Sequence, residues 1–442
     1  MIRLEKIKNK NTKFRYFLWL IILIILVIVG HYGQVAFTRH GNLVKMDLVE
    51  KPTKLDVKAN SALVVDCTTG QILGEKNADE QVKIASQSKM LTAYGVLQAV
   101  KKGHIKWDDQ VTIPANADLS KQQKETFSHL EIRTGDRVSV RDLYTAMFTN
   151  SANDAAFALA SYLTPANKST QSVLQGWAKE LKLSKSEWYN AAGQQNGDAF
   201  DNRIKTEPVS AANHASAKEV AQIASADLTL DPNLKTVGQQ PYLTYTKNGR
   251  IKTTILTDFG QDNGQIAAQL KSPYNLSIVG LKTGSTPESG AALTAIVTDG
   301  QGNEFLTVIN GAGDYEDHVQ RFQKSLDMVG QVLNEKQAHT YHSGDTLQEM
   351  LAPNTQAGKI AVHVANTQTF WVKKGESLAL KIPDHTTESK IKKDELIGTA
   401  VPKLKAEYLP SNINRQQNIL LASSQSSNPA NNWEKILRWI WP

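Results

Sequence analysis

Three short strings of this chain carry residues that could together perform a hydrolysis. Ser86-Gln87-Ser88-Lys89 places a hydroxyl and an amine three residues apart, Ser151-Ala152-Asn153 adds a hydroxyl and an amide, and Lys282-Thr283-Gly284 adds a cation and a hydroxyl. A serine hydroxyl is a weak nucleophile that needs a base to remove its proton. Side chains three residues apart on a helix share one face. We therefore expect Lys89 to act as the base for Ser86.

The other two strings can supply what such a reaction needs. Burial and a second positive charge both lower the pKa of a lysine, so Lys282 could help to keep Lys89 neutral. The Ser151 hydroxyl could relay a proton to a leaving amine, and the Asn153 amide could hold the backbone of a substrate. Lys282 and Thr283 could bind a terminal carboxylate. Taken together, the residue types favour nucleophilic attack on a peptide that ends in a carboxylate.

The pattern around each string predicts the element that positions it. Apolar residues repeat at helical spacing after Ser86, so this serine is expected at the start of a helix, with its N–H among the unpaired amides there. The second string falls in a short connection between two helices. Gly284 ends a strand, where it would let substrate backbone lie close. The expected helices cover about 86–100, 140–148, 155–160 and 314–333, and the expected strands cover 62–66, 71–75, 277–284, 292–297 and 304–309.

Order and setting give these strings their weight, because each is common alone. Ser389-Lys390-Ile391-Lys392 and Ser426-Ser427-Asn428 also fit two of the patterns. The first begins no apolar-periodic helix, and the second lies in a polar stretch. Neither is expected to take part in the chemistry.

Composition excludes several other classes of function. The net charge is +7, but residues 1–15 contain six basic residues and one acidic residue, so most of the excess lies there. No basic stripe interleaved with aromatic residues remains, and we expect no nucleic-acid partner. The single cysteine, Cys67, cannot form a disulfide within the chain or a multi-thiolate metal site. The ten histidines show no paired spacing, so we expect neither metal nor cofactor.

The 442 residues divide into four predicted parts. Residues 1–50 form an N-terminal signal or anchor segment with a linker, and 51–337 form the catalytic domain. From about residue 340 helical periodicity gives way to alternation, which predicts a small β-rich domain over 338–405. Residues 406–442 are expected to be a linker rich in Ser and Asn, followed by an amphipathic tail.

Both ends of the chain carry possible membrane segments. Phe17–Val29 is an unbroken apolar run behind a basic flank, which fits either a cleaved signal peptide or an uncleaved anchor and places the remainder outside the cell. In the tail, Trp433, Ile436, Leu437 and Ile440 fall on one helical face, which suits a membrane interface. The alternative for the tail is a helix that docks on the protein itself.

With these strings in place, the chain resembles the low-molecular-weight penicillin-binding proteins, which are serine-type D-alanyl-D-alanine carboxypeptidases. Their S-x-x-K, S-x-N and K-T-G set is matched here in order. The resemblance runs from about Leu55 to Val401 and extends to further short matches. These are Val64-Val65-Asp66, Asn77-Ala78-Asp79, Asn153-Asp154-Ala155-Ala156 and Asn310-Gly311-Ala312.

The resemblance implies an α/β (α+β) fold like that of penicillin-binding proteins and serine β-lactamases. In that fold an antiparallel sheet is flanked by helices, and a small all-β domain follows. It also implies that Ser86 is acylated, that Lys89 is the base and that the N–H groups of Ser86 and Ser285 form the oxyanion hole. The implied substrate is a peptidoglycan stem peptide ending in D-Ala-D-Ala, with β-lactam antibiotics as covalent inhibitors. The implied location is the outer face of the cytoplasmic membrane.

Two departures and two alternatives accompany this interpretation. Ala152 stands where relatives often carry Gly or Asp, and Ser285 stands where they often carry a larger residue. A β-lactamase is one alternative, but its deacylating Glu-x-x-Leu-Asn string is matched only by Glu180-Leu181-Lys182-Leu183-Ser184, which lacks the Asn. A catalytically silent wall-binding protein of the same fold is the other. The intact Ser, Lys and Asn set argues against it.

Overall fold

The computed structural model describes residues 16, 19, 21–22, 47–123, 127–256, 266, 269–272, 274–410 and 418–440. Most of the apolar run Phe17–Val29 lies outside these residues, so the choice between a signal peptide and an anchor stays open. Within the described part of the chain, no helix is both long enough and apolar enough to cross a membrane.

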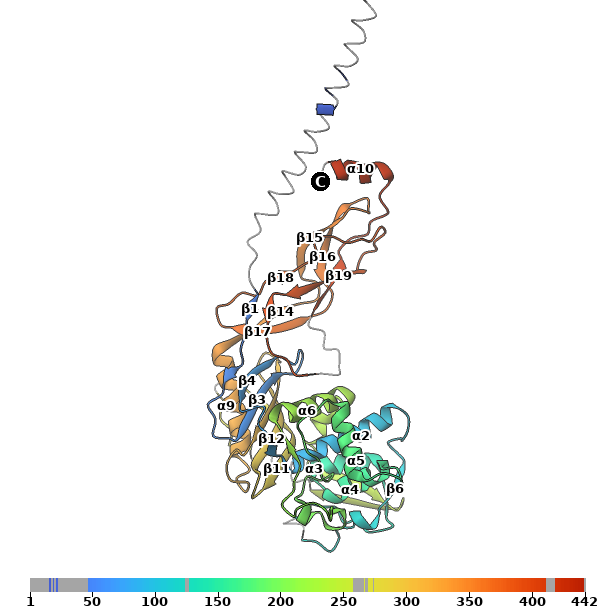
Figure 1. Cartoon of the computed structure of the whole chain (residues 1–442), viewed down its shortest axis with the longest axis vertical. Helices are drawn as coiled ribbons and strands as arrows, with labels where there is room; N and C mark the ends of the chain where they lie inside the picture. The colour runs from blue at the N-terminus through green and yellow to red at the C-terminus, as the bar shows by residue number, and fades with distance from the viewer. Residues whose placement is uncertain are drawn as a thin grey trace, which may run out of the picture.

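A six-stranded sheet forms the centre of the larger part of the molecule (Figure 1). Its strand order is β11 (Ser277–Thr286), β12 (Gly290–Thr298), β13 (Glu304–Asn310), β3 (Ser61–Asp66), β4 (Ile72–Lys76) and β2 (Thr53–Lys54). Neighbouring strands are antiparallel, except that β2 runs parallel to β4. The strands predicted over 62–66 and 71–75 are confirmed as β3 and β4, which pair with each other across the turn at Thr69-Gly70.

The two faces of this sheet belong to two different cores, because successive side chains of a strand point in opposite directions. On β3, Leu63 and Val65 belong to one hydrophobic cluster, and Ala62 and Val64 belong to the other. Helices α2 (Lys89–Lys101) and α6 (Ala217–Leu230) cover the first face. Helix α9 (Gln320–Glu335) covers the second. The predicted antiparallel sheet flanked by helices is confirmed.

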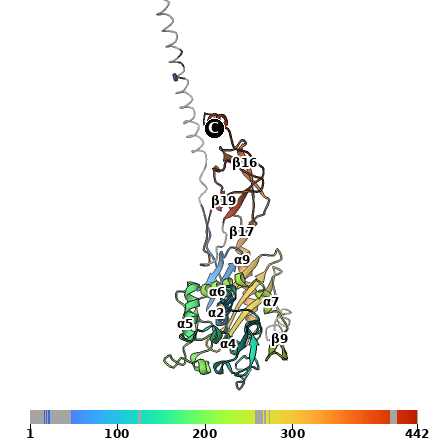
Figure 2. The same cartoon turned by 90° about the vertical axis from the view of Figure 1, so that its right-hand side faces the viewer.

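The remaining elements of this part surround α2 (Figure 2). The helices are α3 (Val140–Thr149), α4 (Asn153–Leu163), α5 (Thr170–Glu180) and the short α7 (Leu234–Val237). Four strands form a second sheet in the order β10 (Ile251–Leu256), β9 (Tyr242–Lys247), β7 (Arg137–Ser139) and β6 (Gln110–Thr112). A further pair joins β5 (Val82–Lys83) to β8 (His214–Ala215). The short 3-10 turns are η1 (Ala85–Ser88), η2 (Ala115–Ala117), η3 (Asn196–Asp198) and η4 (Phe200–Asn202).

The last helix of this part begins later than its sequence pattern predicts. The prediction of a helix from about residue 314 is wrong for its first turn and a half, since α9 begins at Gln320. The carboxylate of Asp314 accepts a hydrogen bond from the backbone N–H of Glu316, and that of Asp317 accepts from Val319 and Gln320. Such local bonds compete with helix formation and favour turns.

A β-rich region follows α9. Its five-stranded antiparallel sheet has the order β15 (Thr346–Ala352), β16 (Gly358–Val364), β21 (Ile419–Ser423), β19 (Leu396–Pro402) and β18 (Leu380–Lys381). Two smaller pairs join β14 (Lys336–Tyr341) to β17 (Gln368–Lys373) and β1 (Leu48–Val49) to β20 (Leu404–Lys405).

The interpretation of the polar stretch after residue 406 as a linker is wrong for β21. This strand lies in the middle of the five-stranded sheet, and its Ile419 and Leu421 side chains are fully buried. The apolar run Ile419–Ala422 is only four residues long. Because Ser, Asn and Gln residues surround it, the composition of the whole stretch is that of a linker. Beyond it, the predicted terminal helix is present as α10 (Asn432–Ile440), at the end of the β-rich region that lies away from the central sheet (Figure 1).

One tryptophan fastens the β-rich region to the central sheet. Trp371 of β17 is buried in the cluster beneath α9, with its ring centroid 5.2 Å from that of Phe305. Its backbone N–H donates to Gln71 Oε1 at 3.0 Å, and Gln71 Nε2 donates to the Trp371 carbonyl at 2.8 Å. Its indole N–H donates to Asp66 Oδ1 at 3.3 Å. Side chains and backbone of the two regions therefore form one continuous packed structure.

Candidate active site

Ser86 and Lys89 meet at the start of α2. Residues 85–88 form the 3-10 turn η1 rather than the first turn of an α-helix, and α2 continues from Lys89. The Lys89 ammonium or amine donates to Ser86 Oγ at 2.7 Å and to the backbone carbonyl of Ala192 at 2.9 Å. The Lys89 side chain has no exposed surface. The expected contact between hydroxyl and amine is therefore present.

The surroundings of Lys89 favour its neutral form. Burial is the main reason that the pKa of Lys89 lies well below its ordinary value, and the positive charge of Lys282 lowers it further. The carboxylate of Asp154, on the next residue after the S-x-N string, acts in the opposite direction. A neutral amine in hydrogen-bond contact with a serine hydroxyl can accept its proton.

The K-T-G strand packs directly against the turn that carries Ser86. A Cβ atom at Gly284 would lie 2.8 Å from the carbonyl oxygen of Ile84, so only glycine allows this close approach. Beneath the turn, Gln87 Nε2 donates to Thr294 Oγ1 at 2.9 Å. Lys282 is 1% exposed and donates to the Thr283 carbonyl at 2.9 Å. The strand thus brings Lys282, Thr283 and Gly284 beside η1.

Ser151 and Ala152 lie, as predicted, in a short connection between two helices, and Asn153 is the first residue of the second helix, α4. Ser151 has a positive φ of 50°, which turns the chain sharply between α3 and α4. The backbone N–H of Asn153 donates to the Ser128 carbonyl at 2.8 Å, and Asn150 Nδ2 donates to the Leu256 carbonyl at 3.1 Å. Asn153 Oδ1 is buried and has no hydrogen-bond partner within the described residues.

Ser285 has a contact that its sequence position does not indicate. Its exposed hydroxyl accepts a hydrogen bond from Arg321 Nη1 at 2.7 Å, and the Arg321 side chain is buried beneath the strand. The same nitrogen lies 3.4 Å from the carbonyl oxygens of Gly284 and Ala292. A third cation therefore stands beside the K-T-G strand. Nothing in the spacing of the motifs points to Arg321.

The turn Asn190–Gln194 is the second feature that the motifs do not indicate. It supplies the Ala192 carbonyl to Lys89, and its Ala191 carbonyl accepts from Thr92 Oγ1 at 3.0 Å. Its contribution is made through backbone oxygens, which every residue possesses. Residue types alone could not have revealed it.

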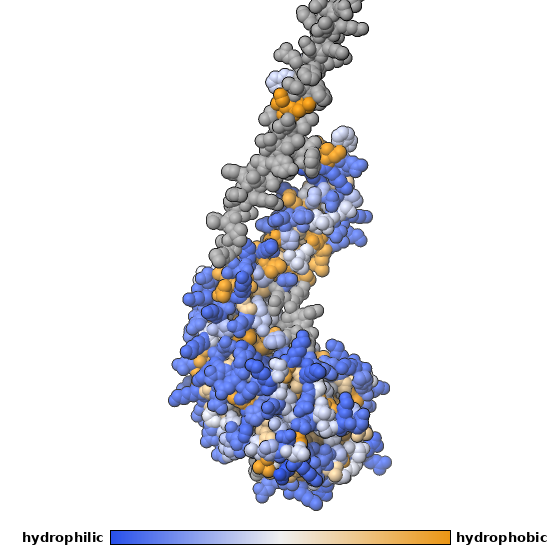
Figure 3. Space-filling model, viewed as in Figure 1, coloured by the Kyte–Doolittle hydropathy of each residue, from blue (hydrophilic) through white to orange (hydrophobic). Residues whose placement is uncertain are grey.

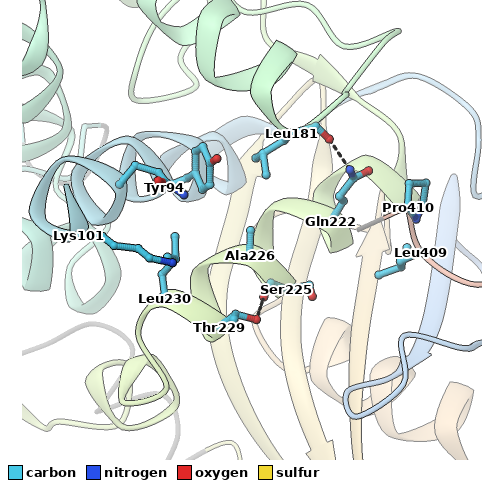
Figure 4. Close-up of a pocket in the computed structure, with 11 residues that line it drawn as sticks. Tyr94, Lys101, Leu181, Gln222, Ser225, Ala226, Thr229, Leu230, Leu409 and Pro410 are labelled. Atoms are coloured by element: carbon cyan, nitrogen blue, oxygen red, sulfur yellow. Dashed lines mark hydrogen bonds between the residues drawn. The ribbon is translucent and has the colours of Figure 1, made fainter. Parts of the chain in front are cut away.

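Other possible sites lie apart from this cluster. Within the described residues, no group of three or more His, Cys, Asp and Glu side chains is arranged to hold a metal ion. A cavity of about 270 Å³ lies between α2 and α6 and is lined by Tyr94, Leu181, Gln222 and Leu409 among others (Figure 4). It contains none of the residues discussed above. Glu180, the closest match to a β-lactamase base, lies against Tyr94 on this side of α2.

Comparison with known proteins places the chain in a family. Residues 48–313 match the family model described as D-alanyl-D-alanine carboxypeptidase, which is more than half of the chain. The chain belongs to the D-alanyl-D-alanine carboxypeptidase family. The matched segment contains all three strings and the turn Asn190–Gln194.

Individual relatives agree with this assignment. The chain is 29% identical over 265 residues to DacC of Escherichia coli, and 28% identical over 276 residues to DacD of the same organism. These matches cover 60% and 62% of this chain and 58% and 64% of the two carboxypeptidases, so they span somewhat less than two thirds of the relatives' length.

The fold is shared with solved penicillin-binding proteins. The structure of PBP3 from Streptococcus pneumoniae has a TM-score of 0.70 at 21% identity and matches 85% of this chain and 100% of its own. Penicillin binding protein 5 from Haemophilus influenzae has a TM-score of 0.58 at 19% identity, over 85% of this chain and 98% of its own. The expected fold class of the penicillin-binding proteins is confirmed.

Proposed function

We propose that this protein is a serine-type D-alanyl-D-alanine carboxypeptidase of the cell wall. The observation that carries the proposal is the fully buried Lys89, 2.7 Å from Ser86 Oγ and under the influence of Lys282. Family membership gives the substrate class, a peptidoglycan stem peptide that ends in D-Ala-D-Ala. Penicillins, as β-lactams, would acylate the same serine.

The reaction proceeds in two steps. Ser86 Oγ attacks the carbonyl carbon of the penultimate D-alanine while Lys89 takes the hydroxyl proton. The N–H groups of Ser86 and Ser285 stabilise the oxyanion. The carbon–nitrogen bond then breaks, and the terminal D-alanine leaves after its nitrogen receives a proton through Ser151. Water hydrolyses the ester on Ser86, which releases the shortened peptide and restores the hydroxyl.

The remaining residues hold the substrate. Lys282 and Thr283 bind its terminal carboxylate, and Gly284 allows its backbone to lie along β11. The buried Oδ1 of Asn153 accepts an N–H of the peptide, which supplies the partner that this oxygen lacks within the described residues. In this proposal each residue that defines the S-x-x-K, S-x-N and K-T-G patterns has a part in binding or in proton transfer.

A labelling experiment tests this function. The full chain is incubated with a fluorescent penicillin and, separately, with a D-Ala-D-Ala peptide. We expect a stable covalent label and release of D-alanine, and Ser86→Ala should abolish both. Ser389→Ala is the matched control, because Ser389 begins the other S-x-x-K string and lies exposed in the β-rich region. Rapid penicillin turnover without D-alanine release would indicate a β-lactamase, and inertness would indicate a silent wall-binding protein.

We further propose that the protein works outside the cytoplasmic membrane and that α10 attaches it to that surface. Trp433 is 74% exposed and Leu437 is 60% exposed on this helix, which lies at the outer end of the β-rich region (Figure 3). Arg438 anchors the helix by donating to the carbonyls of Pro353, Thr355 and Gln356. An amphipathic helix held in this way can place apolar side chains in a lipid interface.

Deletion of residues 433–442 tests the attachment. We expect the shortened protein to move from the membrane fraction to the soluble fraction while penicillin labelling is retained. Lys435→Ala is the control, because it alters the exposed polar side of the same helix. Unchanged membrane retention of the deletion variant would assign the attachment to the N-terminal segment instead.

We also propose a division of the chain into functional parts. The catalytic unit corresponds to residues 51–337 and the β-rich unit begins near residue 338, after α9. Because β21 completes the β-rich sheet, this second unit extends to at least Ser423.

A further inference from the structure

The base Lys89 depends on a turn that none of the three strings contains. Of its two hydrogen bonds, one reaches Ser86 Oγ and the other reaches the carbonyl oxygen of Ala192. A neutral amine has two N–H groups and one lone pair. When one N–H is committed to the Ala192 carbonyl, rotation about the Cε–Nζ bond is restricted, and the lone pair can be held toward the Ser86 hydroxyl.

The side chain of Asn190 folds this turn. Its Oδ1 accepts three successive backbone N–H groups, from Ala192 at 3.2 Å, Gly193 at 2.9 Å and Gln194 at 3.2 Å. Its Nδ2 donates to the Gln194 carbonyl at 2.7 Å. The Asn190 side chain is buried, so water cannot readily replace it. One amide therefore fixes the direction of the backbone on both sides of the Ala192 carbonyl.

A second buried asparagine connects this turn to the segment that leads into the nucleophile. Asn213 Oδ1 accepts from the backbone N–H of Tyr189 at 2.7 Å and of Asn190 at 3.3 Å, and Asn213 Nδ2 donates to the Asn190 carbonyl at 2.8 Å. The backbone carbonyl of Asn213 accepts from Ile84 N–H at 3.3 Å, two residues before Ser86. The acceptor of Lys89 and the chain entering Ser86 thus share one network.

Close packing seats the turn against η1. Gly193 has a φ of +81°, and a Cβ atom there would lie 1.9 Å from the carbonyl oxygen of Ala85. Thr92, one turn along α2 from Lys89, donates to the Ala191 carbonyl at 3.0 Å. The turn is held to the helix at two successive carbonyls, so a shift of its backbone would be transmitted to Lys89.

We propose that Asn190, supported by Asn213, is a positioning residue that orients the Ala192 carbonyl and through it the amine of Lys89. This inference rests on the proposed function, since it assigns a part in the acylation of Ser86. The asparagine itself does not touch the reacting atoms. Its effect should therefore fall on the acylation step and not on the initial binding of the ligand.

The experiment measures penicillin acylation of the full chain and separates the initial binding constant from the first-order acylation constant. For Asn190→Ala we expect acylation to slow by about 10- to 100-fold, as for displacement of a reacting group by roughly an ångström, with little change in initial binding. Asn190→Asp keeps the oxygen that accepts the three N–H groups but loses the donor to the Gln194 carbonyl, so its acylation rate should lie between those of Asn190→Ala and the wild type.

Controls separate positioning from general loss of structure. Asn196 is an equally buried asparagine, and its side chain bonds the backbone of Ile204, Glu207 and Pro208 but not the turn at Asn190. Asn196→Ala should lower the melting temperature without selectively slowing acylation. If folded Asn190→Ala is acylated at the wild-type rate, the proposal is overturned. Equal slowing of acylation in Asn190→Ala and Asn196→Ala would also overturn it.

A second variant covers the case in which Asn190→Ala does not fold. Thr92→Val keeps the side-chain volume and removes one of the two fastenings of the turn, so it should slow acylation several-fold. Thr307→Val is its control. Thr307 is a buried residue of the central sheet, and its hydroxyl donates to the Ala295 carbonyl of the neighbouring strand. Unchanged acylation in Thr92→Val would contradict the proposal. If the wild type itself is not labelled at Ser86, the proposed function fails instead.

Discussion

At the scale of single residues, the site works by opposing charges around one buried amine. Burial and Lys282 lower the pKa of Lys89, and Asp154 raises it. A base must be neutral before it can take a proton, and the best pKa lies near the working pH. Asp154 therefore limits how far the pKa of Lys89 falls. In the proposed mechanism, this keeps the amine basic enough to deprotonate Ser86.

Neutralising Asp154 gives a prediction with a definite sign. In Asp154→Asn the negative charge that raises the pKa of Lys89 is lost, so this pKa should fall further. The neutral amine then exists at lower pH, and the acidic limb of the pH profile for penicillin acylation should move to lower pH. The measurement is the acylation rate across pH, with Asp394→Asn in the β-rich region as the exposed control. A shift to higher pH, or none, would refute the charge argument.

The three strings could be picked out from the sequence because their side chains are of the types that the proposed chemistry requires. Ser86, Lys89 and the K-T-G strand lie together as expected, and Ser151 lies between two helices as predicted. Asn190 and Arg321 escaped prediction for a physical reason. One contributes by folding backbone, and the other reaches Ser285 from a helix that is distant in sequence.

At the scale of elements, glycines decide how closely the segments around Ser86 approach one another. Gly284 brings β11 against Ile84, and Gly193 brings the turn Asn190–Gln194 against Ala85. Ala85 itself has a positive φ of 45°, a conformation that a non-glycine residue rarely adopts. Packing from two sides holds this residue in place, and such strain is typical of functional sites.

Replacement of Gly193 tests this arrangement. In Gly193→Ala the added methyl group would overlap the Ala85 carbonyl, and the residue would also have to keep a φ of +81°. We expect a loss of about 1–3 kcal/mol in the free energy of unfolding together with much slower penicillin labelling. Gly176→Ala is the control, because Gly176 lies in α5 with open space around its Cα, and the change should be neutral or slightly stabilising. If Gly193→Ala and Gly176→Ala had the same free energy of unfolding and the same rate of penicillin labelling, this account would be contradicted.

Elements with a clear apolar period were predicted well, and those that depend on their partners were not. The central strands β12 and β13 are buried along almost their whole length and β11 is buried near its middle, and all three appear where the apolar residues indicate. Strand β21 has only a short apolar run. Strands β1 and β20 are two residues long and pair with each other, although more than 350 residues separate them in the sequence. Pairing over such a separation leaves no local signal.

At the scale of the whole molecule, the β-rich region is fixed to the catalytic part by buried polar contacts as well as by Trp371. Lys336 Nζ donates to Glu50 Oε2 at 2.9 Å, with both side chains almost wholly buried, and Glu50 Oε1 accepts from the Lys373 backbone at 2.7 Å. Breaking one partner of a buried ion pair is costly. The two regions should therefore unfold together and hold α10 at a fixed position relative to Ser86.

Truncation of Trp371 tests this coupling. Trp371→Ala removes a buried indole and its hydrogen bond to Asp66, so we expect a loss of about 3–5 kcal/mol in the free energy of unfolding. Because the residue belongs to the core beneath α9, the transition of both regions should move to lower denaturant concentration in one step. Denaturant unfolding followed by a probe in each region measures this. Trp433→Ala is the control, since its exposed side chain should contribute little to stability. The wild type could instead show two separate unfolding transitions, with Trp371→Ala affecting only that of the β-rich region. That result would mean that the β-rich region is an independent unit and not a fixed extension of the catalytic part.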